Sequence, residues 1–533
     1  MAKVFKRRWM MHDMARQRVF DKREFLNILE LLKRMDYNGI GLYLEGAMEF
    51  KTIDGVIREG VITYDDAKWI VEECNKRDIF VFPMTNVVGH MEHFLAQERF
   101  RGMKYDDMSQ LDFYHPEAEA FAMQIVHEFV DAFGTKMVHI GGDEAKLPHE
   151  KMPDYAKFLA KICDNLLAEG IQPAIWDDLI WMDKELCEPF SRDVFLFDWN
   201  YYGHRPESIK FFREKGFKDL VVGPCDNSWE TFITYQRLSG HLLAHTDIPV
   251  RPDEIEAFLE DEAETDDPEK LGAIITNWEN NAGRNLWCQW STFARAGLFM
   301  TGKLQARERN DELIEKTLFG RVTPYTSIVY LLHDVIVKHN LDHNWSPRLR
   351  NCIFAHGALR TALIEAMEGK PAFVDDMDET LKEIRRRLDG WTPADDIENY
   401  CLVSMISLHD MLRAGLELVK AFAQRDALYS KAAELQFTNP ELAGQYLNRF
   451  ISGVRRAIEE VYNARESYAW NLELVNVDKS DVSRIDLVID LLCDLADMLE
   501  KSLDSFQRIP LPILEKTVIG CIDRNPFAAK VFK

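Results

Sequence analysis

The sequence contains no long apolar run and no excess of positive charge. No stretch approaches the roughly 20 consecutive apolar residues that a membrane-spanning helix needs. Of the 533 residues, 65 are Lys or Arg and 89 are Asp or Glu, which gives a formal net charge of −24. Nucleic acids and anionic membrane surfaces repel such a charge. We therefore expect no nucleic acid and no membrane as a partner, whereas a neutral ligand is compatible with this composition.

Cysteine is also scarce and shows no pattern. The nine cysteines form no C-x-x-C pair, and an odd, scattered count is typical of reduced thiols rather than of a disulfide framework. The chain begins with the basic stretch Met1–Trp9, and no apolar segment of a secretory signal follows it. We therefore expect a cytoplasmic protein.

The first 300 residues alternate short apolar runs with amphipathic stretches, which is typical of βα units. Hydrophobic residues make up 47% of the chain, enough for a large core and more than one domain. The expected strands are a first one that ends at residues 12–16, then 37–45, 79–83, 137–140, 171–178, 194–202, 220–224 and 272–279. Eight strands with helices between them predict an α/β fold, a (β/α)8 TIM barrel, over residues 1–307.

From about residue 308 onward the strand pattern disappears and helical spacing of apolar residues takes its place. The stretches with this spacing are 325–337, 351–367, 376–388, 397–422, 441–463 and 480–506. They predict an all-helical C-terminal domain over residues 308–533. The sequence leaves its role open between packing on the barrel, covering part of a cleft, and forming a homodimer.

Residues 137–146 combine a strand with two acids. The stretch reads Met-Val-His-Ile-Gly-Gly-Asp-Glu-Ala-Lys, so a short apolar run stops at two glycines and is followed by Asp143 and Glu144. In a TIM barrel the carboxyl ends of the strands form the face that carries the chemistry. Crowded carboxylates repel each other, so one of them holds a raised pKa, which suits a general acid near neutral pH. The plain alternative is a solvated acidic pair at a strand end.

The string His-Ile-Gly-Gly-Asp-Glu-Ala resembles the signature of glycoside hydrolase family 20, the β-N-acetylhexosaminidases. The resemblance covers about residues 8–300, and it indicates a compact member without the usual preceding α/β domain. It implies that the substrate's own 2-acetamido oxygen acts as the nucleophile. Glu144 would protonate the leaving oxygen, and Asp143 would orient the acetamido group and stabilise the oxazolinium intermediate. The resemblance implies no cofactor, and the sequence shows no spacing typical of metal ligands.

Two further residues match the family in its order along the barrel. Arg16, in Asp-x-Ala-Arg, resembles the arginine that binds the O3 and O4 hydroxyls of the terminal sugar; a planar guanidinium can donate to two neighbouring hydroxyls. Alternatively, Arg16 forms a salt bridge with Asp13. His90 lies in Val-Gly-His where the family has Pro-Gly-His. We expect it to support the carboxylates through hydrogen bonds, although a single histidine is more often structural.

Tryptophans follow several of the expected strands. Trp176, Trp199 and Trp278 each lie at a strand end, and aromatic rings bind the apolar C–H faces of sugars. Core packing is the ordinary role for any one of them, but three at the same face fit the aromatic box that the resemblance implies. Trp229 is a further candidate wall from the seventh loop.

The remaining candidates are polar. Tyr201 resembles the tyrosine that hydrogen-bonds the acetamido carbonyl, and Tyr202 is its rival. Glu279 follows Trp278 and would contact O4 or O6 of the sugar. Further acids without an assigned role are Glu45, Asp177 and Asp178.

The sequence therefore predicts an exo-acting, retaining β-N-acetylhexosaminidase. Its substrate would be a β-linked N-acetylhexosaminide, as an oligosaccharide or a glycoconjugate, from which it releases terminal GlcNAc or GalNAc. Two alternatives remain. One is the same barrel with another specificity, such as release of a disaccharide or of deacetylated glucosamine. The other is an inactive barrel that only binds carbohydrate.

Overall fold

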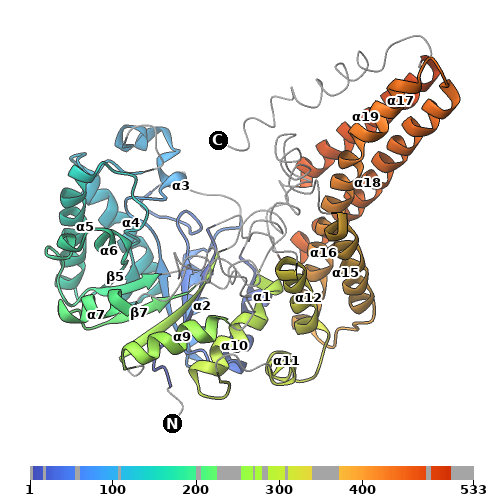
Figure 1. Cartoon of the computed structure of the whole chain (residues 1–533). Coiled ribbons are helices and arrows are strands. Elements are labelled where there is room, and N and C mark those ends of the chain that lie inside the picture. Colours follow the sequence, from blue (N-terminus) through green and yellow to red (C-terminus); the bar gives the residue numbers. More distant parts are fainter. Residues whose placement is uncertain are drawn as a thin grey trace. The chain divides into compact units, whose positions relative to one another are not determined.

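A computed structural model gives the structure of the chain (Figure 1), and it describes residues 4–15, 20–53, 60–105, 110–199, 206–224, 254–267, 270–278, 286–305, 310–338, 371–475 and 482–505. By internal packing the chain divides into two units. The first comprises Met1–Glu279 and Gln289–Val322, and the second comprises Asn280–Cys288 and Thr323–Lys533. The predicted domain boundary at residue 307 stays a prediction; residues 308–322 pack with the first unit.

The first unit contains a closed barrel of parallel strands in the order β1 to β8. The strands are β1 (Arg8–Asp13), β2 (Gly39–Tyr43), β3 (Phe80–Met84), β4 (Met137–His139), β5 (Gln172–Trp176), β6 (Phe195–Trp199), β7 (Leu220–Gly223) and β8 (Leu271–Asn277). The ring closes where β1 pairs with β8, with Trp9 opposite Ile274. Together with the helical residues that follow, this architecture confirms the predicted TIM barrel and helical C-terminal region.

Helices connect the strands of the barrel and follow its last strand. They are α1 (Lys22–Arg34), α2 (Tyr64–Asn75), α3 (Glu92–Leu95), η1 (Glu98–Met103), α4 (Ala118–Phe133), η2 (His149–Lys151), α5 (Met152–Ala168), α6 (Asp178–Met182), η3 (Lys184–Cys187), α7 (Pro206–Glu214), α9 (Glu254–Thr265), α10 (Trp290–Met300) and α11 (Asp311–Phe319).

Several of these helices begin and end where the local sequence supplies a cap. The Asp21 side chain accepts a hydrogen bond from the backbone N–H of Glu24 at the start of α1. Thr63 and Asp66 form a reciprocal capping box at the start of α2. Helix α4 ends at Gly134, whose φ of 58° lies in the left-handed region that glycine adopts without a steric penalty. Local sequence therefore positions the connections between the strands.

Large side chains fill the barrel interior, so the barrel is a packed core rather than a channel. The ring of Trp9 on β1 lies within about 6 Å of Phe82 on β3 and of Phe195 on β6, centroid to centroid. A Cβ at Gly39 would lie 2.2 Å from Trp9 Cδ1, so glycine at this position of β2 makes room for the indole. The buried cluster also includes Met11, Tyr43, Met84, Met137, Ala174, Trp176, Phe197, Val221 and Ile274.

The second unit is helical over its described residues. Its main helices are α12 (Tyr325–Lys338), α15 (Pro371–Asp389), α16 (Asp396–Ala423), α17 (Arg425–Leu435), α18 (Pro440–Leu474) and α19 (Val482–Ser505). The long helix α18 packs against α16, α17 and α19 (Figure 1). Helix α17 was not among the predicted helices, and the predicted helix at 351–367 lies outside the described residues. No helix in the described part of the chain combines the length and hydrophobicity needed to span a membrane.

A network of charges links α15 and α16 around Asp378. Its carboxylate accepts hydrogen bonds from Arg413 and, at 2.8 Å, from Lys420. Lys382 Nζ lies 2.8 Å from the other oxygen. Burial alone would raise the pKa of Asp378, but the hydrogen bonds from these three cations outweigh it and hold that pKa well below its usual range.

Gly297→Ala tests the close packing of α10 on the turn after α1. A Cβ at Gly297 would lie 2.3 Å from the backbone oxygen of Met35, and the backbone must move to make room for it. We expect a loss of about 1–3 kcal/mol in the free energy of unfolding, the usual cost of overpacking, measured by urea unfolding of the barrel. Gly102→Ala is the control, because a Cβ there meets nothing within 4 Å. An unchanged unfolding midpoint for Gly297→Ala would contradict the described packing.

Asp378→Asn tests the charge network of the helical unit. A carboxylate whose pKa is lowered in the folded state contributes stability above its unfolded pKa of about 3.9, and this stability is lost as the pH falls below that value. We expect the variant to destabilise the helical unit at pH 7 and to flatten the drop in its thermal midpoint as the pH falls below about 4. Asp389→Asn is the matched control, because Asp389 is exposed at the end of α15 and pairs with Arg385 on its own helix. Equal pH profiles for wild type and Asp378→Asn would rule out the described role.

Candidate active site

Two glycines place the acids at the carboxyl end of β4. Gly141 and Gly142 have φ values of 80° and 105°, in the left-handed region that favours glycine. A Cβ at Gly141 would lie 1.5 Å from Asn86 Oδ1, so a side chain does not fit there. The turn leaves Asp143 only 8% exposed, whereas the side chain of Glu144 is 59% exposed. The two neighbouring acids therefore have opposite environments.

His90 faces both acids from the loop after β3. Its Nε2 lies 3.3 Å from Glu144 Oε2 and 3.9 Å from Asp143 Oδ2. A Cβ at Gly89 would lie 3.0 Å from the backbone oxygen of Asp143, so the two loops approach closely at this point. The structure thus brings together three of the predicted site residues.

Asp178 connects the ends of three strands. Its Oδ2 accepts a hydrogen bond from the backbone N–H of Glu144 at 3.0 Å, and its Oδ1 accepts one from Trp199 Nε1 at 3.1 Å. The neighbouring Asp177 accepts from the backbone N–H of Trp199 at 3.0 Å. These contacts hold the acidic turn after β4 to the ends of β5 and β6. The sequence marked both aspartates as candidates, but their partners depend on how the strands are aligned.

Several carboxyl groups lie close together at the site, and their burial and mutual repulsion shift the pKa values of its residues. Burial raises the pKa of Asp143, and repulsion by Asp178 raises it further. Burial likewise raises the pKa of Asp178. The hydrogen bond with Glu144 raises the pKa of His90, against the opposite effect of its burial, and the charge of Asp143 adds to this rise. A carboxyl group of the site can therefore stay protonated near neutral pH, whereas an isolated aspartate would be ionised.

His139 supports the glycine turn from inside the barrel. The fully buried His139 has a pKa lowered to about 3 by burial, so it is neutral. Its Nδ1 accepts a hydrogen bond from the backbone N–H of Gly141 at 3.1 Å. Its ring packs against Trp176 with 4.4 Å between the ring centroids. His139 therefore holds the turn that presents the acids.

The predicted aromatic residues lie at different depths. Trp199 and Trp278 are half-buried and pack against the top of the barrel core. Trp176 is only 1% exposed, and its ring lies 6.5 Å from that of Trp278. Trp176 is thus part of the core beneath the site in this structure, and its contact with a sugar stays a prediction. Tyr43 joins the group, since its ring packs edge-on against Trp278 at 4.9 Å.

Tyr43 also anchors Glu45 at the end of β2. Its hydroxyl donates to Glu45 Oε1 at 2.6 Å and accepts from Asn86 Nδ2 at 2.8 Å. Asn86 is the residue that contacts Gly141, so the loops after β2, β3 and β4 share one set of contacts. Glu45, His90 and Glu144 all have positive φ values, between 43° and 49°. Such strain in residues other than glycine concentrates at functional sites.

The other predicted site residues lie outside the described residues. They are Arg16, Tyr201 with its rival Tyr202, Trp229 and Glu279. Their roles in sugar binding stay predictions.

Comparison with known proteins supports the interpretation of this site. Residues 41–169 match the family model for the glycosyl hydrolase family 20 catalytic domain. Solved structures with a similar fold include a β-N-acetylhexosaminidase from Bacteroides fragilis, with 18% identity and a TM-score of 0.43, covering 57% of this chain and 67% of that one. Another is the Streptomyces plicatus N-acetyl-β-hexosaminidase, with 15% identity and a TM-score of 0.44, covering 61% of this chain and 68% of that one.

The family match includes β3, β4 and the loops that carry Glu45, His90, Asp143 and Glu144. The matched stretch also contains the acidic motif His-Ile-Gly-Gly-Asp-Glu-Ala. Residues 41–169, which lie within the barrel, match the catalytic domain of glycosyl hydrolase family 20, a family of glycoside hydrolases, and this match confirms the resemblance in the sequence.

Proposed function

We propose that the protein is an exo-acting, retaining β-N-acetylhexosaminidase, which releases terminal GlcNAc or GalNAc from β-linked oligosaccharides or glycoconjugates. The observation that carries the proposal is the arrangement at the end of β4. There a buried acid, Asp143, adjoins an exposed acid, Glu144, and the imidazole of His90 faces both. The family match supports hydrolysis of a glycosidic bond, and the geometry of the acids supports this particular reaction.

Glu144 is the general acid and base. Its side chain is exposed enough to reach the glycosidic oxygen of a bound sugar, while its backbone N–H is held by Asp178. It gives a proton to the leaving oxygen and in the second step takes one from the attacking water. His90, 3.3 Å away, orients the carboxyl group. Both protonation states of Glu144 are therefore used in one turnover.

Asp143 acts on the substrate's acetamido group. Adjacent residues at one turn cannot flank a glycosidic bond in the way that the two carboxylates of ordinary retaining enzymes do, and substrate-assisted families are the exception to that scheme. In this mechanism the acetamido oxygen attacks the anomeric carbon, and Asp143 orients the amide and stabilises the positive oxazolinium. An intramolecular nucleophile also gains from a high effective molarity. The product keeps the β configuration.

The cysteines support the further proposal that the enzyme works in the cytoplasm. Those in the described part of the chain are all free thiols, and Cys74, Cys163 and Cys401 are among the buried ones. Burial raises the pKa of each of these three thiols. Unpaired thiols are usual in a reducing compartment.

Glu144→Gln tests the general acid. We expect a folded protein whose turnover on an aryl β-N-acetylglucosaminide with a poor leaving group falls at least about a hundredfold. The loss should shrink for an activated aryl group, because a good leaving group needs less help from a proton. Steady-state kinetics on both substrates measure this difference.

Glu150→Gln is the matched control for this change, because Glu150 is an exposed glutamate farther along the same loop. It should keep wild-type rates on both substrates. Near-normal turnover of Glu144→Gln on the poor leaving group would refute the assigned role.

A series of aryl glycosides with increasing fluorine on the acetamido methyl tests substrate assistance. Fluorine withdraws electron density from the carbonyl oxygen, so we expect kcat to fall steeply along the series if that oxygen is the nucleophile.

Asp143→Asn should lower kcat on the N-acetyl substrate at least about a hundredfold, because the oxazolinium loses its countercharge. A flat series would favour the alternative specificity, as would a plain β-glucoside that is cleaved as well as the N-acetyl sugar. If the enzyme cleaves no member of a panel of aryl β-glycosides that differ at C2 and C4, the result would favour an inactive binding barrel.

A further inference from the structure

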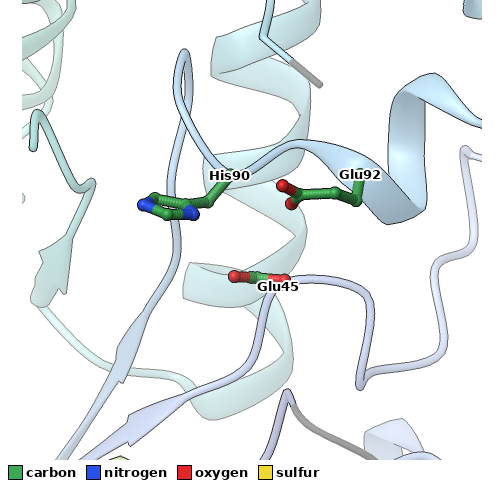
Figure 2. A group of neighbouring side chains, drawn as sticks. All are labelled: Glu45, His90 and Glu92. Carbon is green, nitrogen blue, oxygen red and sulfur yellow. The ribbon is translucent and has the colours of Figure 1, made fainter. Parts of the chain in front are cut away.

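A group of side chains of the types that ligate metal ions adjoins the acidic pair and shares His90 with it. It consists of Glu45 from the loop after β2, His90 from the loop that leads into α3, and Glu92, the first residue of α3. One carboxylate oxygen of each glutamate and one ring nitrogen of the histidine all lie within 4.8 Å of one another. Figure 2 shows the three end groups around one common space, with the carboxylate of Glu92 turned toward the imidazole.

His90 can serve this cluster without leaving Glu144. Its Nε2 faces Glu144 Oε2 at 3.3 Å, which leaves Nδ1 for the other side of the ring, and Figure 2 shows a ring nitrogen turned toward Glu45 and Glu92. Histidines that bind a metal through one nitrogen commonly donate the other N–H to a carboxylate, which fixes the tautomer and the ring orientation. The contact between His90 and Glu144 is therefore the kind of partner that a metal-bound imidazole needs.

Glu45 and Glu92 differ in their exposure to solvent, as is suitable for a site that an ion enters from solvent. The side chain of Glu45 is buried, and Tyr43 holds it in place through Oε1. Glu92 is exposed, and its carboxylate has no hydrogen bond or ion pair with another side chain in the described part of the chain. One ligand is thus preorganised, and the other can move to close on an ion that arrives from solvent.

His93 adds a second imidazole. Its Nε2 lies 3.8 Å from Glu45 Oε2, and its side chain is 42% exposed. Two imidazoles and two carboxylates form a ligand set that Zn²⁺ and similar first-row cations accept, whereas Mg²⁺ and Ca²⁺ prefer oxygen ligands alone. Tetrahedral zinc needs ligand atoms about 3.3 Å apart, so the exposed Glu92 must move inward, and His93, which lies outside the group of mutually close ligand atoms, must move further.

We propose that Glu45, His90 and Glu92, with His93 as a fourth ligand, bind one divalent cation of the zinc class. The ion would fasten the end of β2 to the start of α3. It would also hold the imidazole of His90 in the orientation in which Nε2 faces Glu144. The site adjoins the acidic pair and shares one residue with it, but its existence does not depend on the proposed glycosidase activity.

Zinc titration of the full chain tests the proposal directly. After treatment with a chelator, the wild type should bind one equivalent of Zn²⁺ in isothermal titration calorimetry, and its thermal midpoint should rise with zinc concentration because the ion binds only the folded state. Mg²⁺ at the same concentration should do neither. Glu92→Gln should bind zinc at least about tenfold more weakly.

Matched variants locate the ion. Glu98→Gln makes the same chemical change at an exposed glutamate of the following turn η1, which pairs with Arg101, and it should bind zinc like the wild type. Glu144→Gln should also retain zinc. Loss of zinc in Glu144→Gln together with retention in Glu92→Gln would overturn the proposal, because it would place the ion on His90, Asp143 and Glu144. Equal affinities for wild type and Glu92→Gln would overturn it as well.

These measurements separate the metal site from the proposed function. Calorimetry and thermal midpoints need no turnover, so zinc binding can be established even if no β-N-acetylhexosaminide is cleaved. Glu92→Gln should keep wild-type turnover in the absence of metal, because Glu92 contacts neither Asp143 nor Glu144 in the described structure. Failure of zinc binding would leave the glycosidase proposal unaffected.

Discussion

The hydrogen bond from the backbone N–H of Glu144 to Asp178 is the contact on which the arrangement of the site depends. Glu144 follows two glycines and has a φ of 47°, so its local backbone does not by itself favour the observed conformation. Asp178 lies beyond β5, and it also accepts a hydrogen bond from the indole of Trp199 at the end of β6. A single half-buried carboxylate therefore determines where the exposed acid and one aromatic residue lie relative to each other.

That arrangement carries an electrostatic cost. Asp143 is buried and repelled by the half-buried Asp178, and the burial of charge without a compensating cation is unfavourable. Both carboxyl groups have raised pKa values, and His90, whose own pKa is raised, lies beside Asp143 and Glu144. Strained backbone at Glu45, His90 and Glu144 adds of order 1–3 kcal/mol for each residue. The barrel can sustain this because its interior is filled by large aromatic and aliphatic side chains that do not depend on the site.

The same accumulation of charge connects the proposed reaction to the proposed metal site. All the charged groups that raise the pKa of His90 are carboxylates, namely Glu144, Asp143, Glu45 and Glu92. They lie on two sides of one imidazole, and each ring nitrogen faces one of these sides. His90 is therefore the point at which a bound cation and the general acid would influence one another, through the orientation of a single ring.

The sequence alone determined the barrel, the place of the acids and the helical nature of the C-terminal residues. These features follow from local patterns: apolar runs that end at glycines, and apolar residues at helical spacing. Helix α17 was missed because its stretch, Arg425–Leu435, lacks a clear apolar face. Tertiary structure decided how deep each tryptophan lies, since Trp176 is buried while Trp199 and Trp278 are half-buried. It also decided that Asp178 binds Glu144 and that Glu45 meets His90 and Glu92. The physical reason is that such contacts depend on the alignment of neighbouring strands and on the paths of separate loops, neither of which is encoded within any one stretch of the chain.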